Sequence, residues 1–243
     1  MPLPKMTVPK YDVVLPSQKK VVKIRPFLVR EEKILLMAAE TGEKEQILNA
    51  IRDVLDNCIL TQGIDTSSLP LFDIEYLFLK IRSKSVGEVV TLSYGHVDGV
   101  NSKGEECKVS KELKINLEEI EVHENPKHEG PNIKLTDKVG IILKYPTVEM
   151  MDLVINVSGY EDGIKMIEKC IDAVYEGEET FSRSEFTDEE ISEFILSLNK
   201  EQFGKMENFF ATMPRVRYEH SYKCEGCGED VTIVIVGIED FFG

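Results

Sequence analysis

The chain has 243 residues, of which 42% are hydrophobic and 30% charged, as is ordinary for a globular protein with one large domain or two smaller ones. Its formal net charge of −15 argues against a general nucleic-acid binder, because phosphate contacts need clustered lysine and arginine. The longest apolar stretch, Val231 to Ile238, is too short to span a membrane, and the proline-punctuated N-terminus shows no apolar export signal.

The first predicted elements are a hairpin and a pair of helices. Tyr11–Leu15 and Lys20–Arg25 form alternating runs around a proline-containing turn, which predicts two short strands. A helix follows, with Glu31 in its first turn and Gly42 at its end. A second helix carries an apolar face from Ile47 to Leu55, so we expect an antiparallel helix pair.

The middle of the chain predicts a core helix and a β-ribbon. Leu71–Arg82 is apolar on most sides, which is typical of a helix at the centre of a core. The period then falls to two, which predicts strands over Val89–Tyr94 and within residues 107–120. The polar segment His123–Pro131 holds two prolines, so we expect a linker whose two histidines are solvated.

The second half opens with a predicted strand, Val139–Lys144, and a helix from Val148 to Val154. A longer helix is expected from Asp162 to Tyr175, because isoleucines and a valine recur there at helical spacing. The acidic segment Glu176–Glu185 is predicted to be turn-rich. From Arg215 to the end the alternation returns, which predicts a terminal ribbon.

Two capping boxes mark helix starts in this half. Thr187 is followed three residues later by Glu190, and Asn199 by Gln202, so each pair can satisfy backbone N–H groups reciprocally. Pro214 ends the second of these helices.

Taken together, the pattern predicts an α+β fold of helices and short antiparallel β-ribbons. We expect two halves of similar size, residues 1–124 and 132–243, joined by a linker at 125–131. Each half is predicted to end in a ribbon.

The two predicted ribbons resemble each other loosely in sequence. Tyr94-Gly-His96 is matched by Tyr218-Glu-His220, and a cysteine-containing loop and an alternating strand follow in both. This pattern indicates a degenerate repeat.

Charge is distributed unevenly along the chain. The first 30 residues hold seven basic side chains against Asp12 alone, whereas residues 161–200 hold twelve acids and four bases. The simpler interpretation is a solvated acidic face. The alternative is a pair of complementary surfaces that help the protein assemble with partners.

The sequence carries no standard catalytic or phosphate-binding signature. His220 beside Ser221 is the only neighbouring Ser/His pair, and adjacent strand residues point to opposite faces. We therefore assign no catalytic and no cofactor-binding residues, and we expect that the protein is not an enzyme.

The C-x-x-C pair, Cys224 and Cys227, is the one motif with metal-binding character. A structural zinc site needs four nitrogen or sulfur ligands, and this pair supplies two. His220 is a candidate for a third, and His96 and Cys107 can complete a site if the ribbons pack together. Because a second C-x-x-C is missing, the sequence favours a metal-free turn with reduced thiols, so we assign no cofactor; zinc is the alternative. A strand follows the motif, which disfavours a thioredoxin-like redox role.

Several long stretches resemble the baseplate hub subunit family of T-even-like contractile-tailed bacteriophages. They are LPSQKKVVKIRPFLVREEKILLMAAETGEKEQILNAI, LPLFDIEYLFLKIRSKSVGE and FILSLNKEQFGKMENFFATMPRV, together with a final C-x-x-C-G ribbon that ends in IEDFF. The resemblance runs from Leu15 to Phe242.

This resemblance implies a non-enzymatic phage tail protein that acts in the assembly or structure of the baseplate central hub through protein–protein contacts. The implied partners are other baseplate hub or tape-measure proteins, with no nucleic acid and no membrane. The implied location is the host cytoplasm during assembly, and the tail baseplate if the protein stays in the virion. The oligomeric state is left open.

Two alternative functions remain open. One is a non-virion assembly chaperone for hub or tape-measure proteins. The other is a small zinc-ribbon regulator that binds nucleic acid, which the net charge opposes.

Two aromatic residues near the C-terminus are the candidates for a partner contact. Phe241 and Phe242 can either complete the core or bury themselves in a partner, and we favour the core.

Overall fold

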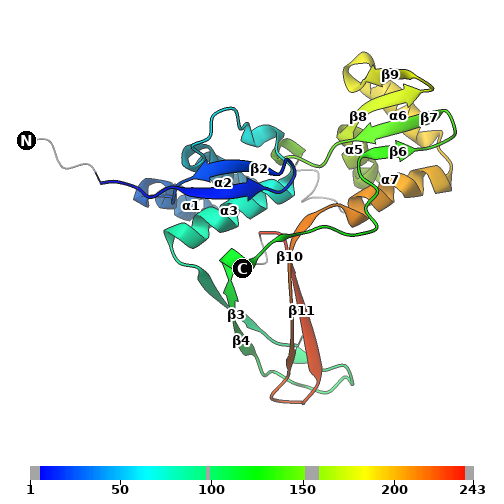
Figure 1. Cartoon of the computed structure of the whole chain (residues 1–243). Coiled ribbons are helices and arrows are strands. Elements are labelled where there is room, and N and C mark those ends of the chain that lie inside the picture. The colour runs from blue at the N-terminus through cyan, green and yellow to red at the C-terminus, as the bar shows by residue number, and fades with distance from the viewer. Residues whose placement is uncertain (1–5, 97–98, 151–158, 239–243) are drawn as a thin grey trace, which may run out of the picture. The chain divides into compact units, whose positions relative to one another are not determined.

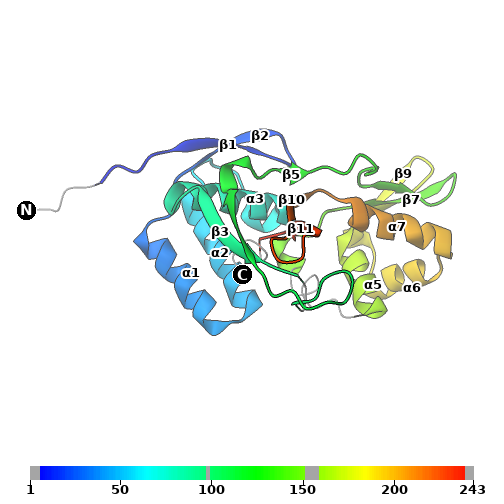
Figure 2. The same cartoon turned by 90° about the horizontal axis from the view of Figure 1, so that it is seen from below.

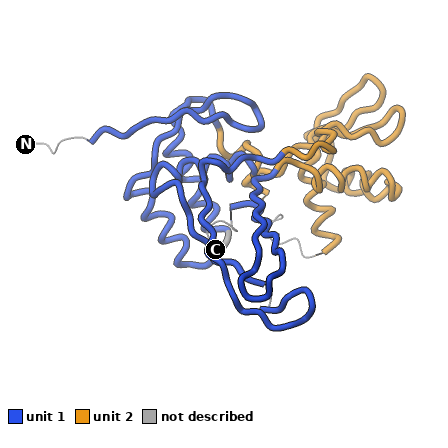
Figure 3. The backbone as a smooth tube through the Cα atoms, turned by 60° about the horizontal axis from the view of Figure 1, so that its bottom comes forward, with its two compact units in different colours: residues 1–64, 72–123, 215–243 blue, residues 65–71, 124–214 orange. Residues whose placement is uncertain are grey.

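A computed structural model of the protein describes residues 6–96, 99–150 and 159–238. The chain forms two compact units, shown in different colours in Figure 3. Unit 1 comprises residues 1–64, 72–123 and 215–243, and unit 2 comprises residues 65–71 and 124–214. Helices and small antiparallel sheets occur in both, which confirms the predicted α+β class.

Unit 1 contains three helices and three small sheets among its described residues. Its helices are α1 (Val29–Thr41), α2 (Lys44–Cys58) and α3 (Leu71–Ser85), whose first residue is counted with unit 2. Its strands are β1 (Tyr11–Leu15), β2 (Lys20–Ile24), β3 (Val89–Tyr94), β4 (Lys111–Asn116), β5 (Val122–His123), β10 (Arg215–Lys223) and β11 (Asp230–Val236).

The hairpin and the helix pair at the start of unit 1 are confirmed. β1 and β2 pair antiparallel, with Val13 opposite Val22. Helices α1 and α2 lie side by side (Figures 1 and 2). Gly42 ends α1 at φ 67°, a left-handed conformation that an L side chain rarely adopts, which explains why glycine stands there.

Helix α3 is a core helix, as its composition predicts. Leu77, Leu79 and Ile81 are fully buried. Lys80 is also buried, and its ammonium group donates to the backbone carbonyls of Leu117 and Glu118, which satisfies its charge by hydrogen bonding.

The two ribbons, β3–β4 and β10–β11, belong to the same unit and share one core. Val90 and Ile115 of the first ribbon cluster with Val216 and Ile235 of the second. β10 also pairs with β5, so that Val216 lies opposite Val122, in a sheet of order β11-β10-β5. This division differs from the expected halves: the units separate near residue 124, but the terminal ribbon packs with the N-terminal unit.

Unit 2 is a four-stranded antiparallel sheet with helices on one face (Figures 1 and 2). Its sheet has the order β6-β7-β8-β9, and its core gathers Ile141, Ile171, Ile195 and Phe209. The elements are β6 (Asn132–Lys134), β7 (Val139–Leu143), α5 (Tyr160–Cys170), β8 (Ile171–Glu176), β9 (Glu179–Ser182), α6 (Asp188–Leu196) and α7 (Lys200–Thr212).

One predicted helix of unit 2 is wrong in its second part. The helix expected over Asp162–Tyr175 ends at Cys170, and β8 continues from Ile171 to Glu176. Because Ile171 and Ala173 are buried and pair into the sheet, tertiary pairing determines the strand where the apolar spacing also fits a helix. β9, within the segment expected to be turn-rich, pairs with β8.

The segment that we expected to be a linker is partly built into unit 2. The ring of His128 is half-buried; its Nδ1 lies 3.0 Å from Thr212 Oγ1 and its Nε2 lies 2.9 Å from the Tyr145 hydroxyl. The expectation that both histidines are solvated is therefore wrong for His128, whereas His123 is exposed. The predicted helix over 148–154 falls largely outside the described residues; Val148–Met150 forms a single 3-10 turn.

Across the described residues, no helix combines the length and the apolar character that crossing a bilayer requires.

Candidate metal centre

Four potential metal ligands meet where the loops of the two ribbons come together in unit 1. His96 follows β3 and Cys107 precedes β4, while Cys224 follows β10 and Cys227 precedes β11. Each ribbon thus contributes one residue from each side of its own loop. The four ligand atoms all lie within 4.8 Å of one another.

Close contacts in this cluster run between the ribbons. His96 Nε2 lies 3.2 Å from Cys227 Sγ, across 131 positions of sequence. Cys107 Sγ lies 3.6 Å from Cys224 Sγ, across 117 positions. Cys107 and Cys224 are buried, and the other two side chains are half-buried.

Local hydrogen bonds shape the loop of the first ribbon. Asn101 is buried, and its side-chain oxygen accepts from the backbone N–H groups of Lys103 and Glu105. The N–H of Cys107 donates to the carbonyl of Gly99 at 2.7 Å. These bonds fold residues 99–107 back on themselves and return Cys107 to the side of the loop where His96 lies.

The loop of the second ribbon is a tight turn around the C-x-x-C motif. The N–H of Cys224 donates to the carbonyl of Glu229, and the N–H of Gly228 donates to the carbonyl of Cys224. Gly228 has a φ of 76°, which this turn needs and which glycine supplies without strain. Backbone N–H groups of Gly226 and Cys227 also donate to Cys224 Sγ.

Direct contacts hold the two loops against each other. The Glu229 carboxylate accepts from both the N–H and the hydroxyl of Ser102, at 3.1 and 2.7 Å. The Tyr222 hydroxyl donates to the carbonyl of Tyr94 at 3.3 Å. The close approach requires glycine at position 226, because a Cβ there would lie 2.7 Å from a methyl carbon of Val109.

Two thiols of this cluster, Cys107 and Cys224, have shifted pKa values. Backbone hydrogen bonds from Cys227 and Gly226, and side-chain contacts with His96 and Cys107, lower the pKa of Cys224 to about 6. For Cys107, the N–H of Val109 acts to lower the pKa, but burial and the two neighbouring cysteines outweigh it and raise the value. Of these two thiols, Cys224 is therefore the one that ionises more readily.

The remaining sequence candidates lie elsewhere. His220 lies within β10, opposite Ile233, and its ring stacks on Tyr218 with centroids 6.3 Å apart; it is not part of the described ligand cluster. Phe241 and Phe242 lie outside the described residues. The sequence predicts His96 and Cys107 as metal ligands only if the two ribbons pack together. In the structure the ribbons do pack together.

The other two cysteines are isolated core residues. Cys58 and Cys170 are fully buried, and burial raises the pKa of Cys58 to about 11 and that of Cys170 to about 12. They behave as small apolar side chains.

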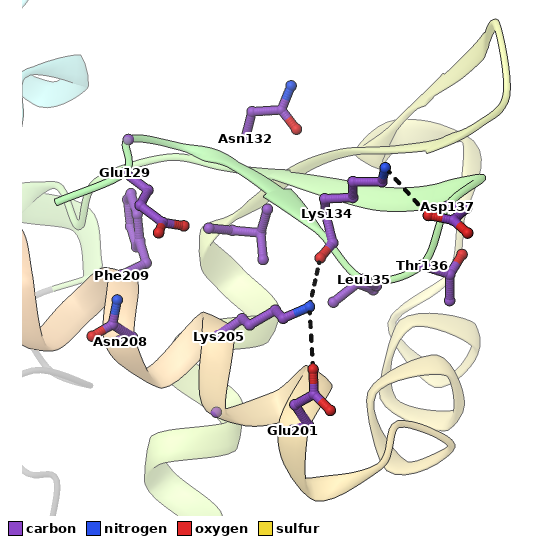
Figure 4. Close-up of a pocket in the computed structure, with 13 residues that line it drawn as sticks. Glu129, Asn132, Lys134, Leu135, Thr136, Asp137, Glu201, Lys205, Asn208 and Phe209 are labelled. Carbon is purple, nitrogen blue, oxygen red and sulfur yellow. Dashed lines mark hydrogen bonds and ion pairs between the residues drawn. The ribbon is translucent and has the colours of Figure 1, made fainter. Parts of the chain in front are cut away.

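A surface hollow of about 830 Å³ lies in unit 2 between β6 and α7 (Figure 4). It holds two ion pairs: Lys134 Nζ lies 3.5 Å from Asp137, and Lys205 Nζ lies 3.7 Å from Glu201 while donating to the carbonyl of Lys134. Glu129 adds a further carboxylate to the lining.

The comparison with protein families identifies the class to which this chain belongs. Residues 8–243 match the family described as T4 bacteriophage base plate protein. Since the match covers nearly the whole chain, the protein belongs to this family of phage baseplate proteins. Neither a search of curated proteins nor a search of solved structures returned a match.

Proposed function

We propose that the protein acts, without catalysis, in the assembly or structure of the central hub of the phage baseplate, through contacts with other baseplate proteins. Membership of the baseplate family over residues 8–243 is the observation that carries this proposal. The lack of a catalytic signature in the sequence agrees with it.

Helix α1 offers a surface suited to such contacts. Val29, Leu36 and Met37 expose 79, 59 and 57% of their surface. Val29 and Leu36 are seven residues apart and therefore share a helix face, with Met37 beside them. Exposed apolar side chains gathered on one element are typical of protein interfaces, so we assign this face of α1 to a partner in the baseplate.

The alternative of a nucleic-acid-binding zinc ribbon is opposed by charge near the ligand cluster. Taken over the two loops and their flanks together, acidic side chains outnumber basic ones, and phosphate binding needs the reverse. The acids are Glu105, Glu106, Glu112, Glu225, Glu229 and Asp230, and the bases are Lys103, Lys108, Lys111 and Lys223.

Quantitative mass spectrometry of purified virions and of tail assembly intermediates tests the role. Near-stoichiometric presence in virions supports a hub component, and presence in intermediates alone supports an assembly factor such as a chaperone for hub or tape-measure proteins. Absence from both would remove the proposed function.

A pair of matched variants tests the contact surface. We expect Leu36→Ser with Met37→Ser to fold normally, because both side chains are exposed, and to lose capture of the co-expressed hub proteins. Leu196→Ser is the control, since Leu196 is 69% exposed on α6 of unit 2. If the α1 double variant and the Leu196→Ser control capture the hub proteins equally well, α1 is not the docking face.

A further inference from the structure

We propose that His96, Cys107, Cys224 and Cys227 bind one structural Zn²⁺ ion that joins the tips of the two ribbons. The inference stands on the geometry of unit 1 and does not depend on the role of the protein in the hub.

The spacing of the four donors is that of a tetrahedral metal site. Zn–S bonds of about 2.3 Å and Zn–N bonds of about 2.0 Å place two sulfur ligands roughly 3.8 Å apart and a nitrogen roughly 3.5 Å from each sulfur. The observed separations are 3.6 Å between Cys107 Sγ and Cys224 Sγ, and 3.2 Å between His96 Nε2 and Cys227 Sγ. All pairs fall within 4.8 Å, so no sulfur–sulfur edge is more than about 1 Å, and no nitrogen–sulfur edge more than about 1.3 Å, longer than a zinc tetrahedron requires.

The donor types select zinc among common metals. Three thiolates and one imidazole are soft to borderline ligands, and they are a standard set for closed structural zinc sites. Mg²⁺ and Ca²⁺ prefer carboxylate and carbonyl oxygen atoms, which are absent from the described ligand cluster. All four positions are filled by protein side chains, so this site leaves no open position for a catalytic water.

A disulfide and a catalytic Cys–His pair both fit the cluster less well than a metal site does. A disulfide needs sulfur atoms about 2.0 Å apart, whereas Cys107 and Cys224 are separated by 3.6 Å. A Cys–His catalytic pair needs a substrate cavity beside it. The described hollow of about 270 Å³ next to the loops is lined by Cys224 but by neither His96 nor Cys227.

The surroundings of the cluster suit bound thiolates. Backbone N–H groups of Gly226 and Cys227 donate to Cys224 Sγ, and the N–H of Val109 donates to Cys107 Sγ. Such outer-shell hydrogen bonds orient metal ligands and spread their negative charge. In both loops, backbone N–H groups thus donate to a cysteine sulfur atom that faces the proposed zinc ion.

A metal ion here has a structural purpose. Each ribbon is a two-stranded hairpin beyond the shared core, and isolated hairpins are marginally stable in water. The apolar side chains Val90 and Ile235 hold the ribbons together at their core ends. A zinc ion bound by the two loops would hold the ribbons together at their other ends. The free energy of zinc binding would then add to the stability of the folded ribbons.

Elemental analysis of the purified full-length protein, kept reduced with a non-chelating phosphine and dialysed against metal-free buffer, tests the proposal. We expect about one zinc per chain. Co²⁺ exchanged into the site should give the visible absorption of a tetrahedral ion and a near-ultraviolet thiolate charge-transfer band.

Point variants test the assignment of the ligands. Cys227→Ser and His96→Gln alter half-buried side chains and should lose most of the bound zinc and the Co²⁺ spectrum. His220→Gln is the matched control, because His220 is a half-buried histidine on the same ribbon outside the cluster, and it should retain the metal. Loss of zinc from the control, or its retention by both ligand variants, would overturn the assignment.

Native protein supplies the test if a variant does not fold. A mercurial thiol reagent should release zinc in step with modification of three cysteines, while the buried Cys58 and Cys170 react only on unfolding. A folded protein without zinc, stoichiometric iron in its place, or a disulfide between any two of the three cysteines would each refute the proposal.

Discussion

At the residue scale, Glu31 shows how a buried charge is stabilised at the start of α1. It is 1% exposed, and its carboxylate accepts from Arg25 Nη2 at 2.8 Å, from Arg30 Nε at 2.6 Å and from the N–H of Leu28 at 2.8 Å. Burial by itself raises the pKa of Glu31, but hydrogen bonds from Arg25, Leu28 and Arg30 outweigh it and lower the pKa to about 2. The ionised form therefore stabilises the fold.

Glu31→Gln tests this arrangement. The variant leaves Arg25 buried without its counter-charge, so the free energy of unfolding at neutral pH should fall on the order of 3 kcal/mol. A depressed carboxyl pKa gives stability that is full above the ordinary value of 4.5 and is lost as pH falls toward 2. The difference between wild type and variant should shrink through that window, measured by urea unfolding from pH 7 to pH 3.

The neighbouring Glu32→Gln serves as the control, because Glu32 is exposed on the same turn. It should change the free energy of unfolding little at any pH. A difference for Glu31→Gln that is independent of pH would mean that its charge is not what stabilises the helix start.

The cluster of His96, Cys107, Cys224 and Cys227 shows which contacts can be predicted from neighbouring residues and which cannot. Cys224 and Cys227 are found from their spacing, since both lie on one tight turn. His96 and Cys107 come from a loop more than a hundred positions away, so only the packing of the ribbons assigns them. The sequence repeat pairs His96 with His220, but His220 lies inside β10, whereas His96 lies beyond the end of β3.

At the scale of elements, starts of helices were predictable because they depend on neighbours in sequence. The capping boxes at Thr187 and Asn199 are both present: Glu190 N–H donates to Thr187 Oγ1 at 3.2 Å, and Gln202 N–H donates to Asn199 Oδ1 at 2.9 Å. β8 was not predictable in the same way. Its residues fit a helical stripe, and pairing with β7 and β9 makes them a strand.

Thr187→Ala should lower the free energy of unfolding by about 1 kcal/mol, because the first turn of α6 loses its side-chain acceptor. Thermal or urea unfolding measures the change. Thr187→Ser keeps the hydroxyl and should restore most of the stability. If serine and alanine destabilise equally, the cap contributes through its methyl group and not through its hydrogen bond.

At the scale of the whole molecule, the chain passes from unit 1 into unit 2 and returns twice, briefly at residues 65–71 and then for residues 124–214. His123 and Arg215 are paired neighbours in the β5–β10 ladder, although 91 residues, 124–214, lie between them. The sequence indicated two halves because each stretch of helices is followed by a ribbon. It did not indicate that the second ribbon completes the first core, since that depends on contacts distant in sequence.

Core substitutions in the two units should act separately. Ile235 belongs to the ribbon core of unit 1 and Ile195 to the core of unit 2, and both are nearly fully buried. We expect Ile235→Ala to cost about 2–5 kcal/mol and to lower hydrogen-exchange protection in β3 and β4 while sparing α7. Ile195→Ala should do the reverse. Equal loss of protection in both units from either variant would show a single cooperative fold.

The discontinuity of unit 1 also sets an order of events during synthesis on the ribosome. β3 and β4 emerge early, but β10 and β11 are made only after all of residues 124–214. Until then, Val90 and Ile115 lack the part of their core that Val216 and Ile235 supply, and His96 and Cys107 lack Cys224 and Cys227. The nascent chain thus carries an unfinished apolar ribbon while unit 2 is being translated, which makes this interval the point at which aggregation competes with folding.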